Sequence, residues 1–376
     1  MTLRELNRAL LARQGLLEPL DAPLAEAVES IGALQAQHWP ALPVALASRV
    51  RAFDPEDLYG ALERGELVAG TLLRATLHLV SAGEHPAYAA VVAAAGTDDW
   101  RRTDAEPGPE AERLRGDLLE YAREAPRTRE DIAAFIEEWL ARHPGALDPK
   151  EIEHQRTYKW RAFLRWSAFV RVPENGHWGS KAPAALRAAP IGPDPPTADR
   201  ALDEVVRRHL RAFGPAGGED VASWIGWRIP PVRAALERLE PELARFEDDN
   251  GRVLYDIPDS PRPGPDAPAP PRLLAPFDSV LLAYAAGRRA RILPDAHRDA
   301  VYERANLRIR PTFLIDGLVA GTWKIEARRH EAVVTLTPLE RLARSARDAL
   351  VREAERVARA IQPAATTHNA VIGTMG

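Results

Sequence analysis

The chain contains 376 residues, 45% of them hydrophobic, and carries a formal net charge of −4. This length suits two to four small domains with hydrophobic cores of their own. The absence of cysteine excludes disulfides, thiolate zinc sites and thiol nucleophiles, and the ten histidines have no metal-ligand spacing. The negative net charge counts against an indiscriminate nucleic-acid binder, so local patches must decide whether DNA is a partner.

The sequence has no apolar run of membrane-spanning length, and its first residues lack the pattern of a signal peptide. We therefore expect a cytoplasmic protein without a membrane partner. Two proline-rich stretches, 183–196 and 258–276, are predicted to be linkers, because closely spaced prolines fit neither helix interiors nor central strands. With a further break near residues 106–109, they divide the chain into four parts: 1–105, 106–190, 197–260 and 272–376.

Helices followed by a pair of strands are predicted in each of the first two parts. In the first part, the helices cover 2–14, 24–34 and 55–64, and the strands cover 67–68 and 76–80. In the second part, Thr128 and Asp131 form a capping-box pattern before a helix. Its helices cover 132–142 and 150–166, and its strands, 169–172 and 177–178, flank an Asn-Gly turn at 175–176.

The third part gives the clearest pattern. Its predicted helices cover 201–213, 220–225 and 230–239, and its strands cover 243–246 and 253–257. The strands flank Asn250-Gly251, which is the strongest short signal for a hairpin. Helix, helix-turn-helix and hairpin in this order is the layout of a winged helix. The repetition favours three tandem units.

The last part changes to strands and ends in a helix. The predicted strands cover 280–284, 312–315, 318–325 and 332–336, with Asp316-Gly317 as a hairpin turn. A terminal helix over 338–361 and a loosely held tail over 364–376 follow. The predicted fold class is therefore α+β, mainly α: three tandem winged-helix units, a strand-rich C-terminal part and a terminal helix.

A short polar insertion, Gln35-Ala36-Gln37, interrupts an apolar stretch of the first part. Pro40 and Pro43 indicate that the preceding helix has ended, and residues two apart in an extended segment project to the same side. We expect the two amides to face one spot. There they could orient a water molecule or hold the edge of a base, because each offers donor and acceptor atoms. Neutral amides cannot act as strong bases.

Two basic clusters are candidates for DNA contact. The first alternates basic and aromatic side chains without an acidic residue: Arg156, Tyr158, Lys159, Trp160, Arg161, Phe163, Arg165, Trp166, Phe169 and Arg171. The second contains Arg288, Arg289, Arg291, His297, Arg298, Arg304, Arg308 and Arg310, diluted by Asp295, Asp299 and Glu303. The alternatives are an aromatic local core with solvated arginines for the first cluster, and an ion-pair network for the second.

Familiar catalytic motifs are missing from the sequence. It contains no Walker loop, dinucleotide fingerprint, nucleophile elbow or persuasive carboxylate pair, so we expect no nucleotide cofactor and no metal. Lysine occurs at only four positions, which leaves few candidates for a Schiff-base nucleophile. A conventional hydrolase site is therefore not predicted.

Several stretches give the chain a resemblance to the AlkZ/YcaQ-type winged-helix DNA glycosylases, a bacterial family that includes self-resistance enzymes against DNA-alkylating natural products. The matching stretches are 34–37, 73–80, 275–282, 311–317 and 320–323. The resemblance spans nearly the whole chain. It implies three tandem winged helices, a strand-rich C-terminal part and a metal-independent, monofunctional glycosylase without a cofactor.

The family's catalytic motif is Gln, an apolar residue, then Gln in the branch that unhooks cross-links, or Asp at the last position in the broader branch. This sequence is similar to the first branch, and Gln35 and Gln37 are the implied catalytic residues. The implied partner is double-stranded DNA with alkylated purines, bound by a monomer. Bulky lesions favour an open, basic channel beside the glutamines over a snug pocket.

The residues that we expect to contact DNA are Arg74, His78, Arg156, Lys159, Arg288, Arg289, Arg291 and Arg329. Alternation places Arg74 and His78 on one strand face, although a lone strand histidine is more often structural. Either the hairpin at 316–317 or the turn at 328–330 could enter a groove, and an ordinary surface hairpin is the alternative. A non-catalytic winged-helix DNA-binding protein or regulator and a protein-docking scaffold are the competing functions.

Overall fold

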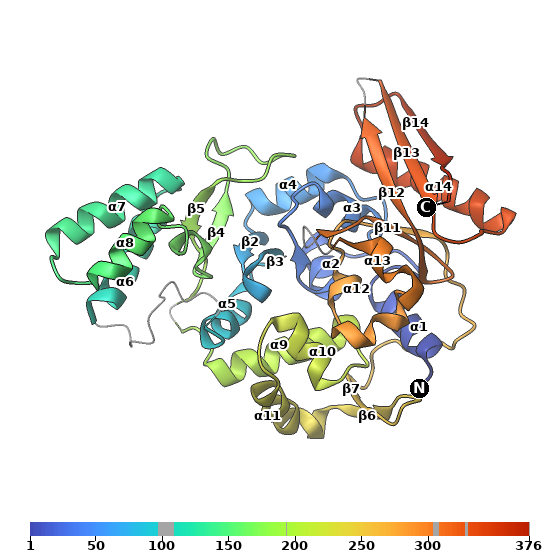
Figure 1. Cartoon of the computed structure of the whole chain (residues 1–376), viewed down its shortest axis with the longest axis horizontal. Coiled ribbons are helices and arrows are strands. Elements are labelled where there is room, and N and C mark those ends of the chain that lie inside the picture. The colour runs from blue at the N-terminus through green and yellow to red at the C-terminus, as the bar shows by residue number, and fades with distance from the viewer. Residues whose placement is uncertain (97–108, 193, 304–307, 328–329, 376) are drawn as a thin grey trace.

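The computed structural model describes residues 1–96, 109–192, 194–303, 308–327 and 330–375, which form a mixed α/β fold (Figure 1). The helices are α1 (Leu3–Arg13), α2 (Leu24–Ile31), α3 (Ala41–Ala47), α4 (Pro55–Glu63), α5 (His85–Ala94), α6 (Pro109–Glu124), α7 (Arg129–Arg142), α8 (Pro149–Thr157), α9 (Ala198–Phe213), α10 (Gly218–Ile225), α11 (Ile229–Leu239), α12 (Ser279–Leu282), α13 (Arg298–Val301) and α14 (Arg344–Ile361). The strands are β1 (Leu34–Gln35), β2 (Leu67–Thr71), β3 (Leu77–Ser81), β4 (Phe169–Val172), β5 (Ala185–Ala188), β6 (Ala244–Glu247), β7 (Val253–Asp256), β8 (Arg272–Leu274), β9 (Tyr302–Glu303), β10 (Arg308–Ile309), β11 (Thr312–Ile315), β12 (Leu318–Ala327), β13 (Glu331–Pro338) and β14 (Thr367–Ile372). None of these helices is long and apolar enough to span a membrane.

The α+β class with a strand-rich C-terminal part is confirmed, and several local signals act as predicted. The Thr128 hydroxyl caps α7 and the Asp131 carboxylate accepts from the Thr128 backbone, which completes the capping box. The Asn250-Gly251 turn joins β6 to β7 as an antiparallel hairpin. The third part therefore has the element order of a winged helix, α9, α10, α11, β6 and β7, whereas the division into three such units stays a prediction.

The helix predicted over 150–166 is wrong, because α8 ends at Thr157. Lys159 and Trp160 follow with positive φ angles of 52° and 54°, which are incompatible with a continuing right-handed helix. Trp160 and Phe163 are buried in the core formed with α6 and α7. Packing of these aromatic side chains overrides the local helical spacing.

Four further predictions fail, three of them because strands pair in ways that the local pattern did not indicate. The pair for β4 is β5, not residues 177–178, so β5 lies inside the stretch 183–196 that was predicted as a linker. Strand β8 lies likewise inside 258–276 and pairs with β11. Residues 280–284 begin in the short helix α12 instead of forming a strand, because Asp278 caps that helix. The predicted loose tail forms β14, which pairs in parallel with β13.

Two five-stranded sheets organise the molecule. The first has the order β1-β3-β2-β4-β5, so strands of the first and second parts share one sheet, joined where Gly70 of β2 lies opposite Val170 of β4. The second has the order β14-β13-β12-β11-β8, and α14 packs against its β14 side and against α3. The first sheet therefore combines two parts of the chain, whereas all strands of the second lie within the last part.

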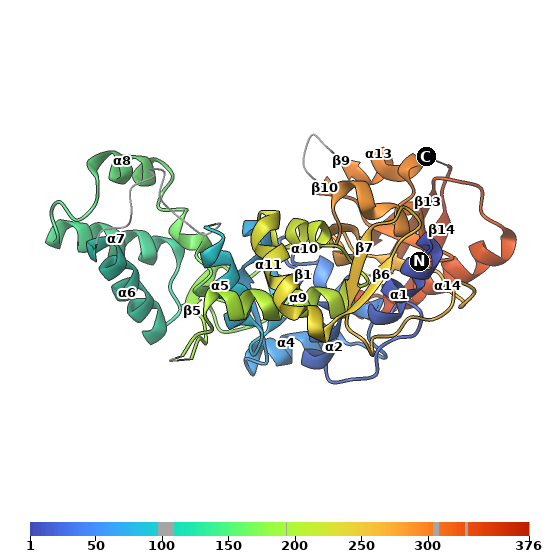
Figure 2. The ribbon, with the colours of Figure 1, turned by 90° about the horizontal axis from the view of Figure 1, so that it is seen from below.

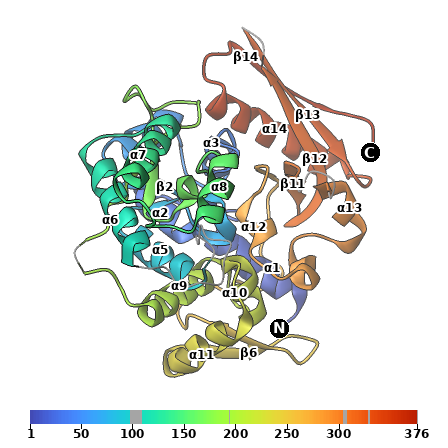
Figure 3. The same ribbon diagram turned by 60° about the vertical axis from the view of Figure 1, so that its left-hand side comes forward.

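The two ends of the molecule are formed by different parts of the chain. Helices α6, α7 and α8 make a lobe at one end, and the C-terminal sheet with α14 lies at the other (Figure 2). Helices α9, α10 and α11 lie along the lower edge in Figure 3, and α9 packs on α5 and α1. The N-terminal residues 27–79 share one hydrophobic core with the C-terminal sheet and α14. One core therefore joins the first and last parts of the chain.

A buried ion pair joins these two parts. The Arg49 and Asp278 side chains are 0% and 1% exposed, and their closest N–O distance is 2.6 Å. The Asp278 carboxylate also accepts hydrogen bonds from the backbone N–H groups of Ala275 and Val280. Nearby, the Ser279 hydroxyl donates to the Ala33 carbonyl at 3.2 Å. The loop before α12 is thus fixed to the segment that enters β1.

Replacing Asp278 by alanine is expected to lower the free energy of unfolding by about 3–5 kcal/mol, because the Arg49 guanidinium is left buried without its partner. Urea denaturation followed by tryptophan fluorescence measures the loss. The control Glu66→Ala removes an exposed partner of Arg64 and should leave the midpoint near that of the unaltered protein. Equal midpoints for the two variants would contradict a stabilising role of the buried pair.

Three histidines are buried in neutral form. Burial lowers the pKa of His78 to about 3 and those of His85 and His209 to about 4. His209 Nε2 lies 2.9 Å from the Ala283 carbonyl oxygen. By contrast, neither ring nitrogen of His85 has a hydrogen-bond partner among the described residues, and its ring lies against Gly70. His85 is therefore a buried polar group whose hydrogen-bonding capacity goes unused.

Acidification is expected to destabilise the fold through these histidines. Their folded pKa values lie below the unfolded value of 6.5, so only the unfolded chain takes up protons as the pH falls from 6.5 to about 4. The stability that depends on these neutral histidines is therefore fully present above pH 6.5 and is lost progressively below it. His85→Leu should reduce this decrease in thermal melts between pH 7 and pH 4.5. The exposed His177→Leu control should not; parallel pH profiles for all three proteins would refute the assignment.

Candidate active site

The Gln35-Ala36-Gln37 segment lies at the end of β1: Gln35 is the last strand residue, and the chain bends at Gln37. After α2, Gly32 turns the chain with a φ of 85°, and a side chain there would meet the Phe213 ring at 3.1 Å. Strand β1 then pairs with β3, with Gln35 opposite His78, and the Ala36 N–H donates to the Leu77 carbonyl at 2.7 Å. The three residues alternate in exposure, because Ala36 is 1% exposed while Gln35 is half-buried and Gln37 is exposed. Ala36 thus enters the core and the two amides lie on the other side.

The two glutamines differ in how they are held. The Gln37 amide oxygen accepts a hydrogen bond from the Leu77 N–H at 3.3 Å, which ties it to β3. No hydrogen bond joins the Gln35 amide to another of the residues that the structure describes. Gln35 instead borders a recess of about 10 Å³ against Phe277 and Asp278, which is close to the smallest space that holds one water molecule. The Asp278 carboxylate beside this recess is already bound to Arg49.

His78 is a fixed neutral group beside Gln35. Directly opposite residues of an antiparallel pair place their side chains on the same face of the sheet. His78 Nδ1 lies 2.8 Å from the Thr76 carbonyl, so its proton sits on Nδ1 and the Nε2 lone pair faces the Arg74 guanidinium at 3.4 Å. Its low pKa of about 3 comes first from burial and then from Arg74. His78 is therefore neither a general acid at neutral pH nor exposed to DNA.

Arg74 supplies positive charge from within the protein. It has a φ of 54° in the turn between β2 and β3, and its guanidinium donates to the Trp224 carbonyl at the end of α10. Burial, aided by the nearby Arg289, lowers its pKa to about 10, so it stays charged at neutral pH. The structure brings Arg74, His78 and Gln35 together, and it assigns Arg74 to the joint between the first and third parts.

The second predicted basic cluster is held largely by internal partners. Arg288 pairs with Glu219 and lies 3.5 Å from Asp220. Arg289 donates to the Tyr284 carbonyl at 3.1 Å, and Arg291 is 3% exposed and donates to the Pro215 carbonyl at 2.8 Å. The burial of Arg291 argues against a contact with DNA. The ion-pair alternative is what the structure shows for Arg288.

The start of the first basic cluster, with Arg156 and Lys159, lies in the lobe of α6, α7 and α8, away from β1 (Figure 2), whereas its last residues belong to β4 of the first sheet. Arg156 pairs with Glu137 at 2.6 Å, and Lys159 lines a shallow hollow beside them. Among its aromatic residues, Trp160, Phe163 and Phe169 are buried, so the local-core interpretation holds for these three. Tyr158 is 55% exposed.

The hairpin at 316–317 does not project freely. Its Asp316 carboxylate binds the guanidinium groups of Arg4 and Arg8, and Gly317 lies against the α1 residue Asn7. This hairpin is a packing element against α1, not a free probe for a groove. The alternative turn includes Arg329, which lies outside the described residues.

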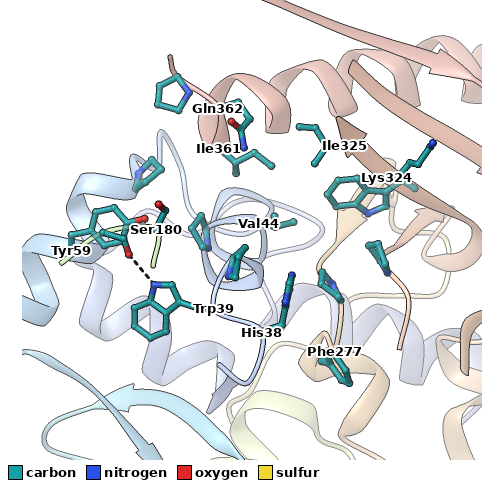
Figure 4. Close-up of a pocket in the computed structure, with 18 of the residues that line it drawn as sticks. His38, Trp39, Val44, Tyr59, Ser180, Phe277, Lys324, Ile325, Ile361 and Gln362 are labelled. Carbon is teal, nitrogen blue, oxygen red and sulfur yellow. Dashed lines mark hydrogen bonds between the residues drawn. The ribbon is translucent and has the colours of Figure 1, made fainter. Parts of the chain in front are cut away.

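A larger cavity opens one residue beyond Gln37 and was not predicted from the sequence (Figure 4). Its volume is about 740 Å³, and His38 and Trp39 form its floor next to the glutamine segment. Pro276 and Phe277 line this cavity and also the recess at Gln35. The two hollows therefore share a wall. Residues as far apart as His38 and Gln362 form it, so no local sequence signal marks it.

Comparisons with known proteins agree with this architecture. The model of the AlkZ-like DNA glycosylase family matches residues 28–360. An interstrand DNA cross-link repair glycosylase of Streptomyces sahachiroi is 25% identical over 358 residues, which cover 92% of each chain. The structure of the S. sahachiroi DNA glycosylase AlkZ superimposes with a TM-score of 0.76 at 23% identity, over 99% of this chain and 100% of that one. The chain belongs to the AlkZ-like DNA glycosylase family.

Proposed function

We propose that this protein hydrolyses the N-glycosidic bond of N7-alkylated purines in double-stranded DNA, including bulky adducts and interstrand cross-links, and that it acts as a monomer. The carrying observation is the segment at the end of β1 in which Ala36 is buried in the core while Gln35 and Gln37 remain accessible. The family supports the reaction class, and the name of the S. sahachiroi relative supports cross-links as substrates.

Neutral amides suit this chemistry because the leaving group is already activated. Alkylation at N7 gives guanine a positive charge, so the base departs without strong help from a general acid. Positive charge then develops on the deoxyribose, as in other glycoside hydrolysis. Amide oxygens held in place stabilise that charge and direct a water molecule at C1′. Neutral His78, with its pKa of about 3, accords with a site that donates no proton.

The two amides receive different tasks from their surroundings. Gln37 is exposed, and its amide oxygen accepts from the Leu77 N–H, so the amide is held at the protein surface beside β3, where DNA could reach it. Gln35 is half-buried beside a recess of single-water size, which suits it to position the attacking water. We therefore assign water positioning to Gln35 and stabilisation of the sugar to Gln37.

Removal of both amides is expected to abolish base release without abolishing DNA binding. Each single variant, Gln35→Ala or Gln37→Ala, should slow single-turnover release by about 10²-fold or more, the usual effect of losing one preorganised dipole. The assay uses a duplex with one N7-alkylated guanine, followed by alkaline cleavage of the abasic site, and anisotropy measures binding. Asn369→Ala, an exposed amide on β14, is the control. Unchanged release in the double variant would refute the catalytic assignment.

The rate of base release is expected to be independent of pH between 6 and 8. His78 remains neutral across this range because its pKa is about 3, and amides do not titrate. Single-turnover rates, corrected for spontaneous depurination in protein-free samples, test this expectation. A bell-shaped profile or an inflection near pH 6.5 would show that a titrating acid or base takes part and would overturn the amide mechanism.

A further inference from the structure

The cavity beside the glutamines, which we call the Trp39 pocket, has a largely apolar and aromatic lining. Trp39 forms its floor, Tyr59 of α4 one side, and Ile325 of β12 with Ile361 of α14 the other side (Figure 4). Trp39 is held rigidly, because its indole N–H donates to the Gly179 carbonyl at 2.9 Å and its ring stacks on Trp178. The volume of 740 Å³ is that of a site for a drug-sized organic group.

Phe277 gives this pocket a direct relation to the proposed chemistry. It has a φ of 58° and lines both the Trp39 pocket and the recess at Gln35. The following residue, Asp278, is locked by the buried pair with Arg49. A group attached to a base held at Gln35 would thus lie next to the apolar Trp39 pocket. Phe277 separates the two hollows, and the neighbouring buried pair fixes its position.

The charges around the Trp39 pocket are unequally distributed. Lys324 lies on the β12 side, opposite Tyr59 (Figure 4), and Arg308 also lines the cavity. Arg308 forms no ion pair with a carboxylate in the part of the chain that the structure describes, and Lys324 has an exposed pair with Glu326. The lining carboxylate is Glu56, which lies near Tyr59. One side of the pocket therefore has positive charge available for an anion.

We infer that the Trp39 pocket receives the organic arm attached to N7 of the damaged purine, and that it favours arms with a flat apolar body and an anionic end. The aromatic floor and apolar sides match a planar body. Arg308 and Lys324 match a terminal carboxylate. This inference rests on the proposed function. It adds that the protein recognises the lesion by its arm as well as by the charge of the base.

The test uses the full chain and three duplexes, each with one N7-alkylated guanine. The first carries a methyl group, the second an aromatic nitrogen-mustard arm that ends in a carboxylate, and the third the methyl ester of that arm. Arg308→Gln and Lys324→Gln are each expected to lower kcat/KM for the carboxylate arm by about threefold to fivefold, with no change for the ester. Tyr59→Ala should lower kcat/KM for the two duplexes with aromatic arms about fivefold relative to kcat/KM for the methyl duplex.

Matched controls remove the same kinds of side chain elsewhere. Arg352 is exposed on α14 and Tyr158 is exposed in the distant lobe, and neither lines the pocket. Arg352→Gln and Tyr158→Ala should leave the ratios among the three substrates unchanged. If the pocket variants lower all three rates and duplex binding equally, the pocket contacts the DNA backbone and the inference is overturned. Unchanged ratios in the pocket variants overturn it as well.

Failure of the proposed function has a different signature. If the protein releases none of the three guanines, the glycosylase proposal fails, and anisotropy with the same duplexes then decides the inference. Tighter binding of the carboxylate arm than of its ester, lost in Arg308→Gln, would support the pocket assignment without any activity. Equal binding of the two arms would overturn it.

Discussion

The contact between Arg49 and Asp278 determines how the two ends of the chain meet. Arg49 follows α3 and Asp278 precedes α12, and both side chains are almost completely buried. A charge buried away from water is tolerated only with a well-placed partner. Removing either residue therefore leaves the other as an uncompensated buried charge, which strongly destabilises the fold. The loop 275–279 is consequently fixed against β1. Gln35, Phe277 and the Trp39 pocket all take their positions from this arrangement.

A second constraint is that Gln35 is half-buried beside a neutral histidine. His78 is buried and neutral, and the one carboxylate lining the Gln35 recess, Asp278, is neutralised by Arg49. Such surroundings disfavour proton transfer but strengthen the interaction of fixed dipoles with a developing charge. Oriented amides are effective in this setting, because their direction is set before substrate binds. The environment and the residue types thus favour the same mechanism.

Local signals in the sequence identified much of the fold. The Thr128–Asp131 capping box and the hairpin turn at 250–251 depend on neighbours within a few residues, and both were predictable. The family resemblance rested on motifs of this local kind. The predictions failed where packing or pairing with another segment decides the outcome, as for β14 on β13 and for the break after α8, where Trp160 is buried against α6 and α7.

The candidate site follows the same division. The sequence marked Gln35 and Gln37 but gave no sign of the Arg49–Asp278 pair, whose members are 229 residues apart. It also predicted Arg291 as a DNA contact. The sequence could not show that this arginine is buried and donates to the Pro215 carbonyl. The Trp39 pocket is the clearest case, because its lining comes from several distant segments.

A site assembled from distant segments has a consequence for specificity. The amides proposed for catalysis lie at the end of β1 in the first sheet, whereas Phe277, Arg308 and Lys324 belong to the C-terminal part. Changes in β10 or β12 can therefore alter the shape and charge of the Trp39 pocket while the Gln35-Ala36-Gln37 segment keeps its pairing with β3. The buried Arg49–Asp278 pair holds the two parts in register during such changes. The fold thereby separates the residues proposed for bond cleavage from those proposed to choose the lesion.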